Sequence, residues 1–154
     1  MARAPFQVLV LPFRTIVQGQ WEFAAFQRSD DQVWQGIAGG GEAGETPAQA
    51  ALREAMEEAG LPATVPFYCL DSISSIPVCH FPARREWPAD LLVIPEHAFA
   101  ADCSGIVLHL SDEHTRQVWE PYEGILARLR WDSNKTALWE LRERLRGNRL
   151  AASR

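Results

Sequence analysis

The sequence predicts an α/β fold in which a mixed β-sheet lies between helical layers. Strand-like segments stand on both sides of one strongly signalled helix, and two further helical segments follow near the C-terminus. The 154 residues, 47% of them hydrophobic, are enough to bury one continuous core. We therefore expect a single domain over residues 1–154.

Three strands are expected before the central helix. Residues 6–13 and 21–27 are rich in β-branched and aromatic side chains, and the turn at 18–20 between them predicts a hairpin. Residues 34–38 fit a third, short strand. The glycine run at 39–41 is expected to loosen the backbone before the helix begins.

The central helix carries start and stop signals at both ends. Thr46 is a favourable N-cap, Pro47 suits the first helical position, and Gln49 completes a capping box. Gly60, with Pro62 just beyond it, ends the pattern. These signals predict a helix over residues 47–59.

The later elements follow from hydrophobic periodicity and from turn residues. Strands are expected at residues 65–73, 91–94, 106–110 and 118–119, a loop at 77–88, and helices at 122–130 and 134–146.

Charge and cysteine content exclude several classes of protein. A net charge of -5 and a pI near 5.4 give no overall field that would attract nucleic acid. The apolar run at residues 8–11 is too short for a membrane span or a signal peptide, so we expect no membrane partner and a cytoplasmic protein. Cys69, Cys79 and Cys103 form an odd set without CxxC spacing, which indicates neither a disulfide framework nor a zinc site. The oligomeric state stays open.

Glu54, Glu57 and Glu58 stand at positions i, i+3 and i+4 of the expected helix, so their side chains share one face. Such a cluster repels itself unless a hard divalent cation, which prefers carboxylate oxygen, lies among the side chains. The alternative is a solvated helix surface, where glutamate pairs are common. Gly39, Glu45 and Arg53 accompany the cluster at fixed spacing and favour the metal site.

The stretch from Gly39 to Leu61 resembles the Nudix box, G-x5-E-x7-R-E-U-x-E-E-x-G-U, where U is a bulky aliphatic residue. Every glycine and charged position is matched, and Ala55 is the one departure, at the first U position. Ala55 changes the packing under the helix but removes no metal ligand. The resemblance implies the Nudix α/β/α sandwich and an enzyme that uses Mg²⁺, with Mn²⁺ as a possible substitute.

The resemblance also implies roles for the residues of the box. Glu54 and Glu58 would be direct metal ligands, and Glu57 a further ligand or a base. Arg53 would orient the ligands by charge-assisted hydrogen bonds to Glu45 or Glu57, and Gly39 would let the backbone curl toward the metal. The metal would neutralise phosphate oxygens and activate a water for in-line attack on phosphorus.

Residues 27–35, 111–119 and 129–134 resemble the dihydroneopterin triphosphate pyrophosphohydrolase group, often labelled dATP pyrophosphohydrolases, which would place the chain in folate biosynthesis. By this resemblance Glu113 would be a further metal ligand and a possible general base. The alternative is an acidic residue of a surface turn. His114 is expected to be an orienting or structural residue, and Trp119 to lie in the core.

Weaker parallels concern the substrate. Arg3 and Arg28 align with positions that contact phosphate or substrate in the family, and Ala38 lies where a small residue borders the base. Arg130 lies near a further matched substrate position. The pair Arg84-Arg85 offers additional positive charge in the middle loop.

Three functions are compatible with these residues. The first is a pyrophosphohydrolase of a (deoxy)nucleoside or dihydroneopterin triphosphate, which would release pyrophosphate and a monophosphate. The second is a hydrolase of dinucleoside polyphosphates or nucleotide sugars with the same metal helix. The third is a Nudix-like module that binds nucleotides without turnover, against which the intact glutamates argue.

Overall fold

A seven-stranded sheet built around β1 (Arg3–Val17) forms the centre of the computed structural model, which describes residues 2–150. The strand order is β3-β2-β1-β6-β5, with β4 paired to β1 and β7 paired to β2. β6 runs parallel to β1, and the other pairings are antiparallel, so the sheet is mixed as the sequence predicts. The remaining strands are β2 (Gln20–Arg28), β3 (Trp34–Gln35), β4 (Ile37–Glu42), β5 (Phe67–Pro77), β6 (Val93–Asp102) and β7 (His114–Glu120).

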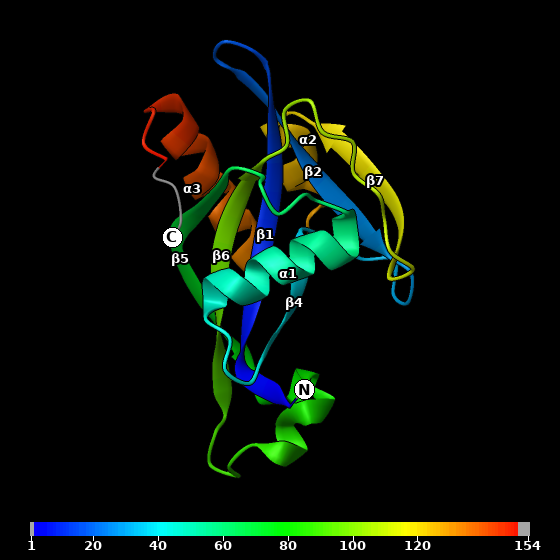
Figure 1. The fold of residues 1–154 in the computed structure, drawn as a ribbon, viewed down its shortest axis with the longest axis vertical. Helices are drawn as coiled ribbons and strands as arrows, with labels where there is room; N and C mark the ends of the chain where they lie inside the picture. The colour runs from blue at the N-terminus through cyan, green and yellow to red at the C-terminus, as the bar shows by residue number, and fades with distance from the viewer. Residues whose placement is uncertain (1, 151–154) are drawn as a thin grey trace.

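Helices cover both faces of this sheet. Helix α1 (Pro47–Ala59) crosses the front face in Figure 1, while α2 (Tyr122–Arg128) and α3 (Asp132–Arg146) lie behind the sheet. This is the helix–sheet–helix layering that the sequence predicts. No helix among residues 2–150 is long and apolar enough to cross a membrane.

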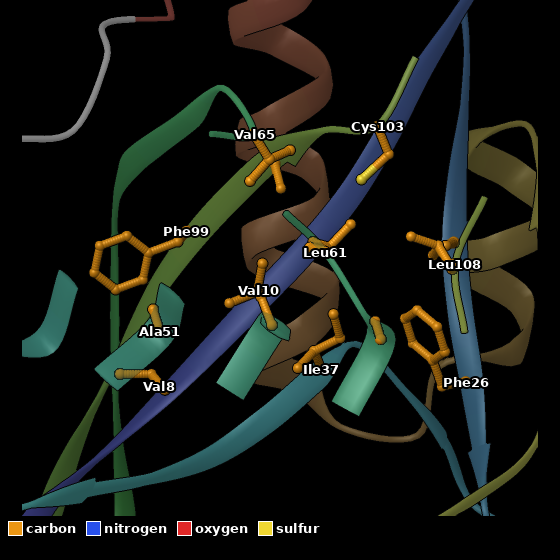
Figure 2. Close-up of a cluster of buried hydrophobic side chains, with 14 of the residues drawn as sticks. Val8, Val10, Phe26, Ile37, Ala51, Leu61, Val65, Phe99, Cys103 and Leu108 are labelled. Carbon is orange, nitrogen blue, oxygen red and sulfur yellow. The ribbon is translucent and has the colours of Figure 1, made fainter. Parts of the chain in front are cut away.

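Alternate residues of β1 divide the core into two clusters. Val8 and Val10 point to the α1 side, where they pack in the cluster of Figure 2, while Leu9 and Leu11 point to the side of α2 and α3. Side chains of a strand alternate between faces, so one strand serves both layers. Full burial of each such side chain contributes about 1.5–3 kcal/mol.

Helix α1 begins and ends as the sequence predicts. The Thr46 hydroxyl accepts a hydrogen bond from the Gln49 N–H at 3.2 Å, and the Gln49 side chain accepts one from the Thr46 N–H at 2.9 Å. Gly60 takes the left-handed conformation, with φ 67°, and its N–H bonds to the carbonyls of Ala55 and Met56. A strong cap at each end thus fixes where α1 begins and ends.

Two sequence-based expectations are wrong. Residues 39–41 do not loosen the backbone; they belong to β4, with Gly39 opposite Val8 and Gly40 opposite Gln7 of β1. Residues 106–110 form no strand. Their backbone instead forms a hydrogen bond with the C-terminal end of α1, where the N–H of His109 donates to the carbonyl of Ala59 at 2.8 Å. The last carbonyls of a helix lack partners within the helix, and this segment satisfies one of them.

Other boundaries shift. The strand expected at 91–94 is only the beginning of β6. The alanines that follow have low strand propensity, so the sequence did not predict that the strand continues, yet they are buried between the helical layers. The loop expected at 77–88 contains two short 3-10 helices, η1 (Val78–His80) and η2 (Pro82–Glu86). β7 extends well beyond the two residues expected. The cysteines are free, with Cys103 buried and Cys69 and Cys79 exposed.

Candidate functional site

A cleft of about 1000 Å³ opens on the sheet between α1 and the first turn of α3. Its lining includes seven of the residues singled out from the sequence, which lie far apart along the chain. They are Arg3, Arg28, Ala38, Gly39, Glu54, Glu58 and Glu113. The fold therefore brings the acidic face of α1 together with two predicted phosphate-binding arginines.

Glu58 is the most enclosed acid of the cleft. Its residue exposure is 5%, and its Oε2 atom is buried without a hydrogen-bond partner among the described residues. Burial first, and then the adjacent carboxylates of Glu113 and Glu54, raise the pKa of Glu58 well above its usual 4.5. Burial also raises the pKa of Glu54. The three acids therefore form one electrostatic unit that lacks sufficient positive charge.

Glu113 reaches this unit because its loop is held at two points. The N–H of Ser29, at the end of β2, donates to the carbonyl of Glu113 at 2.9 Å, and the Ser29 hydroxyl donates to the carbonyl of Asp112 at 2.8 Å. On the other side, the N–H of Ser111 donates to the carbonyl of Glu58 at 3.0 Å. The loop thus ties the end of β2 to the end of α1, with the Glu113 side chain on the cleft.

Gly39 explains how the Glu54 carboxylate fits against β4. A Cβ atom at position 39 would stand 2.1 Å from the Glu54 carboxyl carbon and within 2.5 Å of both oxygens. The carboxylate therefore lies directly against bare backbone. Only glycine allows this approach without moving Glu54.

Arg53 holds several acids in place at once. It bonds Glu45 through two nitrogens, at 2.9 and 3.0 Å, and it donates to Glu54 at 2.9 Å and to the Gly40 carbonyl at 2.8 Å. A planar guanidinium suits this branched geometry, and Glu45 in turn accepts from the Glu42 N–H at 2.8 Å. The structure thus joins Arg53 to both partners considered from the sequence, closely to Glu45 and at 3.3 Å to Glu57.

Glu57 stands apart from the other acids of α1. Its side chain is 60% exposed, its salt bridge to Arg53 is 3.3 Å long, and it does not line the cleft. Its role as a metal ligand or base remains a prediction.

Arg3 is the cation best placed for a phosphate. Its guanidinium covers Gly40, where a Cβ would stand 1.7 Å from the guanidinium carbon, and its Nη2 donates to Gln7 at 2.6 Å. The Nε atom is buried without a hydrogen-bond partner among the described residues. Burial lowers the pKa of Arg3, and the nearby Glu54 opposes that effect.

The other predicted substrate residues differ in their placement. Arg28 lines the cleft but is paired with Asp30 through two bonds, at 2.9 and 2.7 Å. Ala38 lies on the cleft floor. Arg130 is exposed and outside the lining, with its guanidinium 5.6 Å from the ring of Trp131, and Arg84 and Arg85 are also outside it.

His114 and Trp119 lie away from the cleft. The buried ring of His114 is 5.5 Å from that of Phe26, and burial lowers its pKa, which suits a structural role. Trp119 is half-buried against the core on the α1 side, with the Arg14 guanidinium 4.4 Å from its ring.

The cleft also contains residues to which no individual role was assigned from the sequence. Trp131 donates from Nε1 to Gln35 at 3.1 Å, Asn134 accepts from the Gly36 N–H at 2.9 Å, and Glu96 lies buried in the lining. Glu96 lies just beyond the strand expected at 91–94, so no local signal indicated that it would face a cleft. Trp131 and Asn134 belong to the stretch 129–134 that resembles the dihydroneopterin triphosphate group, but one sequence does not show what either residue contacts.

The acidic unit fits a hard divalent cation. Glu54, Glu58 and Glu113 offer carboxylate oxygens, one of them buried and unpaired, and carboxylate is the ligand that Mg²⁺ and Mn²⁺ favour. Within residues 2–150, no three His, Cys, Asp or Glu side chains already stand as a complete metal site. A cation bound there would require these side chains to turn toward it.

Comparison with known proteins gives a consistent family. The model of the NUDIX domain matches residues 8–139. The structure of a Listeria monocytogenes protein assigned to the NUDIX hydrolases has a TM-score of 0.88 and 42% identity, covering 97% of this chain and 100% of that chain. No curated protein sequence matches the chain.

More distant structures share the fold. The E. coli dihydroneopterin triphosphate pyrophosphohydrolase has a TM-score of 0.72 at 22% identity, covering 88% of this chain and 93% of that chain. The C. elegans Ap4A hydrolase in a binary complex has a TM-score of 0.72 at 20% identity, covering 94% of this chain and 99% of that chain. At these identities the likeness concerns the fold alone.

Proposed function

Because this chain belongs to the Nudix hydrolase family, whose members cleave phosphoanhydride bonds of nucleotide-like substrates, we propose that it is a pyrophosphohydrolase of a nucleoside or dihydroneopterin triphosphate. Members of the family generally use a divalent metal such as Mg²⁺, and we propose Mg²⁺ here, with Mn²⁺ as a substitute. The products would be pyrophosphate and a monophosphate.

The observation that carries the proposal is the meeting of Glu54, Glu58 and Glu113 in one cleft with Arg3. A triphosphate is strongly anionic, so acids alone would repel it. A divalent cation held by the acids reverses the local charge, and Arg3 adds a fixed donor beside it. The charge of the acids and the cation together would thus be complementary to that of a phosphate chain.

Each residue then has a defined task. Bound metal would supply charge neutralisation of phosphate oxygens and a more acidic water. Glu113, the exposed member of the unit, accepts the proton of the attacking water, while the buried Glu58 and the half-buried Glu54 would hold the metal. Arg3 donates from its guanidinium to a phosphate oxygen. Arg53 and Glu45 do not touch substrate and act as positioning residues.

Cleft size and lining support a triphosphate attached to a flat ring. A volume of about 1000 Å³ accommodates a nucleotide-sized ligand. The partly exposed indole of Trp131 lines the cleft and can stack on a ring. The stretches that resemble the dihydroneopterin triphosphate group favour this class of substrate.

A second candidate is a hydrolase of dinucleoside polyphosphates or nucleotide sugars. It is favoured by the shared fold of the C. elegans Ap4A hydrolase and of the Shewanella oneidensis NrtR Nudix domain, solved with ADP ribose at a TM-score of 0.65 and 16% identity. A third candidate, a module that binds nucleotides without turnover, would give no role to the buried and unpaired carboxyl of Glu58.

The test is a substrate screen with Mg²⁺ and with Mn²⁺. Dihydroneopterin triphosphate, the dNTPs, diadenosine tetraphosphate and ADP-ribose are incubated with wild type and with Glu58→Gln, in water enriched in oxygen-18. We expect pyrophosphate and a monophosphate from a triphosphate, and a loss of turnover of about a hundredfold or more in Glu58→Gln. The product that carries the label identifies the phosphorus that water attacks.

Turnover of diadenosine tetraphosphate or ADP-ribose without turnover of any triphosphate would replace the leading proposal by the second. Binding of nucleotides without turnover of any compound would favour the non-catalytic module.

A further inference from the structure

We infer that Glu96 is a specificity-determining residue, which selects substrates whose ring carries an amino group beside a ring N–H, as guanine and pterins do. The inference rests on the proposed function, because it concerns the part of the same cleft that would bind the ring of the substrate. Nothing in the phosphate chemistry uses Glu96.

The register of the sheet places Glu96 on the cleft floor. Gln7 of β1 lies opposite Gly40 of β4 and beside Glu96 of β6, and Glu96 lies opposite Ser74 of β5. Residues paired in this way point to the same face, so Gly40, Gln7, Glu96 and Ser74 form one row across four strands. Gly40, Ser74 and Glu96 all line the cleft.

This row begins beside Arg3, where we place the phosphates of the substrate, and it continues to the part of the cleft in which the ring of the substrate would lie. Gly40 lies under the Arg3 guanidinium. Adjacent strands are about 4.8 Å apart, so two strand steps separate Gly40 from Glu96 by roughly 10 Å. That separation is of the order of the span from a phosphate chain across a ribose to the edge of a base.

Glu96 is a buried acid without a cation. Its residue exposure is 8%, and burial raises the pKa of its carboxyl, which a hydrogen bond with Ser133 partly offsets. No charged group contributes to that shift. A buried carboxyl costs free energy unless hydrogen bonds compensate it, and a ligand with N–H donors would supply them.

Other acceptors near the ring end are already engaged. The side-chain oxygen of Gln7 accepts from Arg3 at 2.6 Å, that of Gln35 from Trp131 at 3.1 Å, and that of Asn134 from the Gly36 N–H at 2.9 Å. These bonds fix the orientation of the amides. Glu96 is the buried carboxyl among the acceptors of this part of the cleft, and no charged group contributes to the shift of its pKa.

The chemistry of a carboxylate decides which ring fits. Two oxygens side by side accept two parallel N–H bonds, as in a carboxylate–guanidinium pair. The 2-amino-4-oxopyrimidine ring of guanine and pterins presents a ring N–H beside an amino group. Adenine and cytosine present an amino group beside a bare ring nitrogen, whose lone pair would face a carboxylate oxygen. Glu96 would therefore favour the first class.

The experiment compares dGTP with dITP, which differ only in the 2-amino group. Wild type is expected to prefer dGTP by about tenfold to a hundredfold in kcat/KM, and Glu96→Gln to reduce the ratio to within about threefold. The value for dITP should change little, and that for dihydroneopterin triphosphate should fall with that for dGTP. Asp132→Asn, which removes an exposed acid of the cleft, is the matched control and should leave the ratio unchanged.

A second readout does not depend on turnover. Calorimetric binding of the products dGMP and dIMP to wild type and Glu96→Gln should show the same loss of discrimination, with equal melting temperatures of the two proteins. An equal affinity of wild type for dGMP and dIMP would overturn the inference, as would discrimination that survives Glu96→Gln or is lost in Asp132→Asn. Absence of all triphosphate turnover would contradict only the proposed function.

Discussion

The carboxylate of Glu54 occupies the space in which a side chain of residue 39 would stand, 2.1 Å from the position of a Cβ on Gly39. The clash involves the far end of a flexible side chain. Gly39→Ala is therefore expected to rotate Glu54 away while β4 stays paired with β1. We predict a loss of kcat/KM of about tenfold to a hundredfold, with little change in the free energy of unfolding.

Calorimetric titration with Mg²⁺ and chemical denaturation of Gly39→Ala test this together. Weaker metal binding in a protein of normal stability is the expected pair of results. Normal activity in the variant would show that the contact between Gly39 and Glu54 has no functional role.

Arg53→Lys is expected to keep the charge and lose the geometry. A lysine cannot bond Glu45 through two nitrogens while donating to Glu54 and to the Gly40 carbonyl. We predict a fall in kcat of about tenfold to a hundredfold, and a loss of stability of about 1–3 kcal/mol. Steady-state kinetics and denaturation measure the two effects.

Arg142→Lys provides the control, because Arg142 is about as enclosed as Arg53, with 18% against 22% side-chain exposure, and bonds acids outside the cleft. Its activity should match wild type. If both variants lost activity equally, general loss of arginine pairing would explain the result.

Glu113→Gln separates a catalytic acid from an acid of a surface turn. Since Glu113 raises the pKa of Glu58, its removal should let Glu58 ionise more readily and stabilise the metal-free protein. We predict that kcat falls by about a hundredfold or more while the melting temperature is unchanged or higher. Asp112→Asn alters the neighbouring exposed acid, which does not line the cleft, and should be neutral in both measurements.

The stability of the metal-free protein should fall as the pH rises above 4.5. The pKa of Glu58 is raised above that value in the folded state, so the folded protein binds more protons than the unfolded chain. Under that condition the free energy of unfolding decreases with pH. Denaturation in chelator at about pH 6 and about pH 8.5 should show a larger loss for wild type than for Glu58→Gln.

Mg²⁺ should reverse most of this loss, because it replaces the proton on the acidic unit. Equal pH dependence of wild type and Glu58→Gln, with and without metal, would contradict the assignment of a raised pKa to Glu58.

Local sequence signals were sufficient to predict helix α1, which carries Glu54 and Glu58. Thr46, Gln49 and Gly60 determine where α1 begins and ends, and helical spacing then places Glu54 and Glu58 on one face. The sequence could not separate Glu57 from these two, because the direction of each side chain depends on how α1 packs against β4. In the structure Glu54 and Glu58 line the cleft, whereas the Glu57 side chain is 60% exposed.

Other features depend on long-range pairing. The alanines of β6 give no strand signal and become a strand only because β1 and β5 lie on either side. Residues 106–110 look like a strand, yet the N–H of His109 bonds instead to the carbonyl of Ala59 at the end of α1. Glu96 gains its position only from the register between β1, β5 and β6, which one sequence does not specify.

The central claim, that Glu54 and Glu58 hold a divalent cation beside Glu113, is tested most directly by titrating Mn²⁺ into the folded protein and following free Mn²⁺ by electron paramagnetic resonance, with and without a non-hydrolysable triphosphate. We predict saturable uptake that Glu58→Gln weakens by about tenfold or more and that Glu57→Gln changes far less. No uptake even with the triphosphate present, or equal uptake by wild type and Glu58→Gln, would contradict the account.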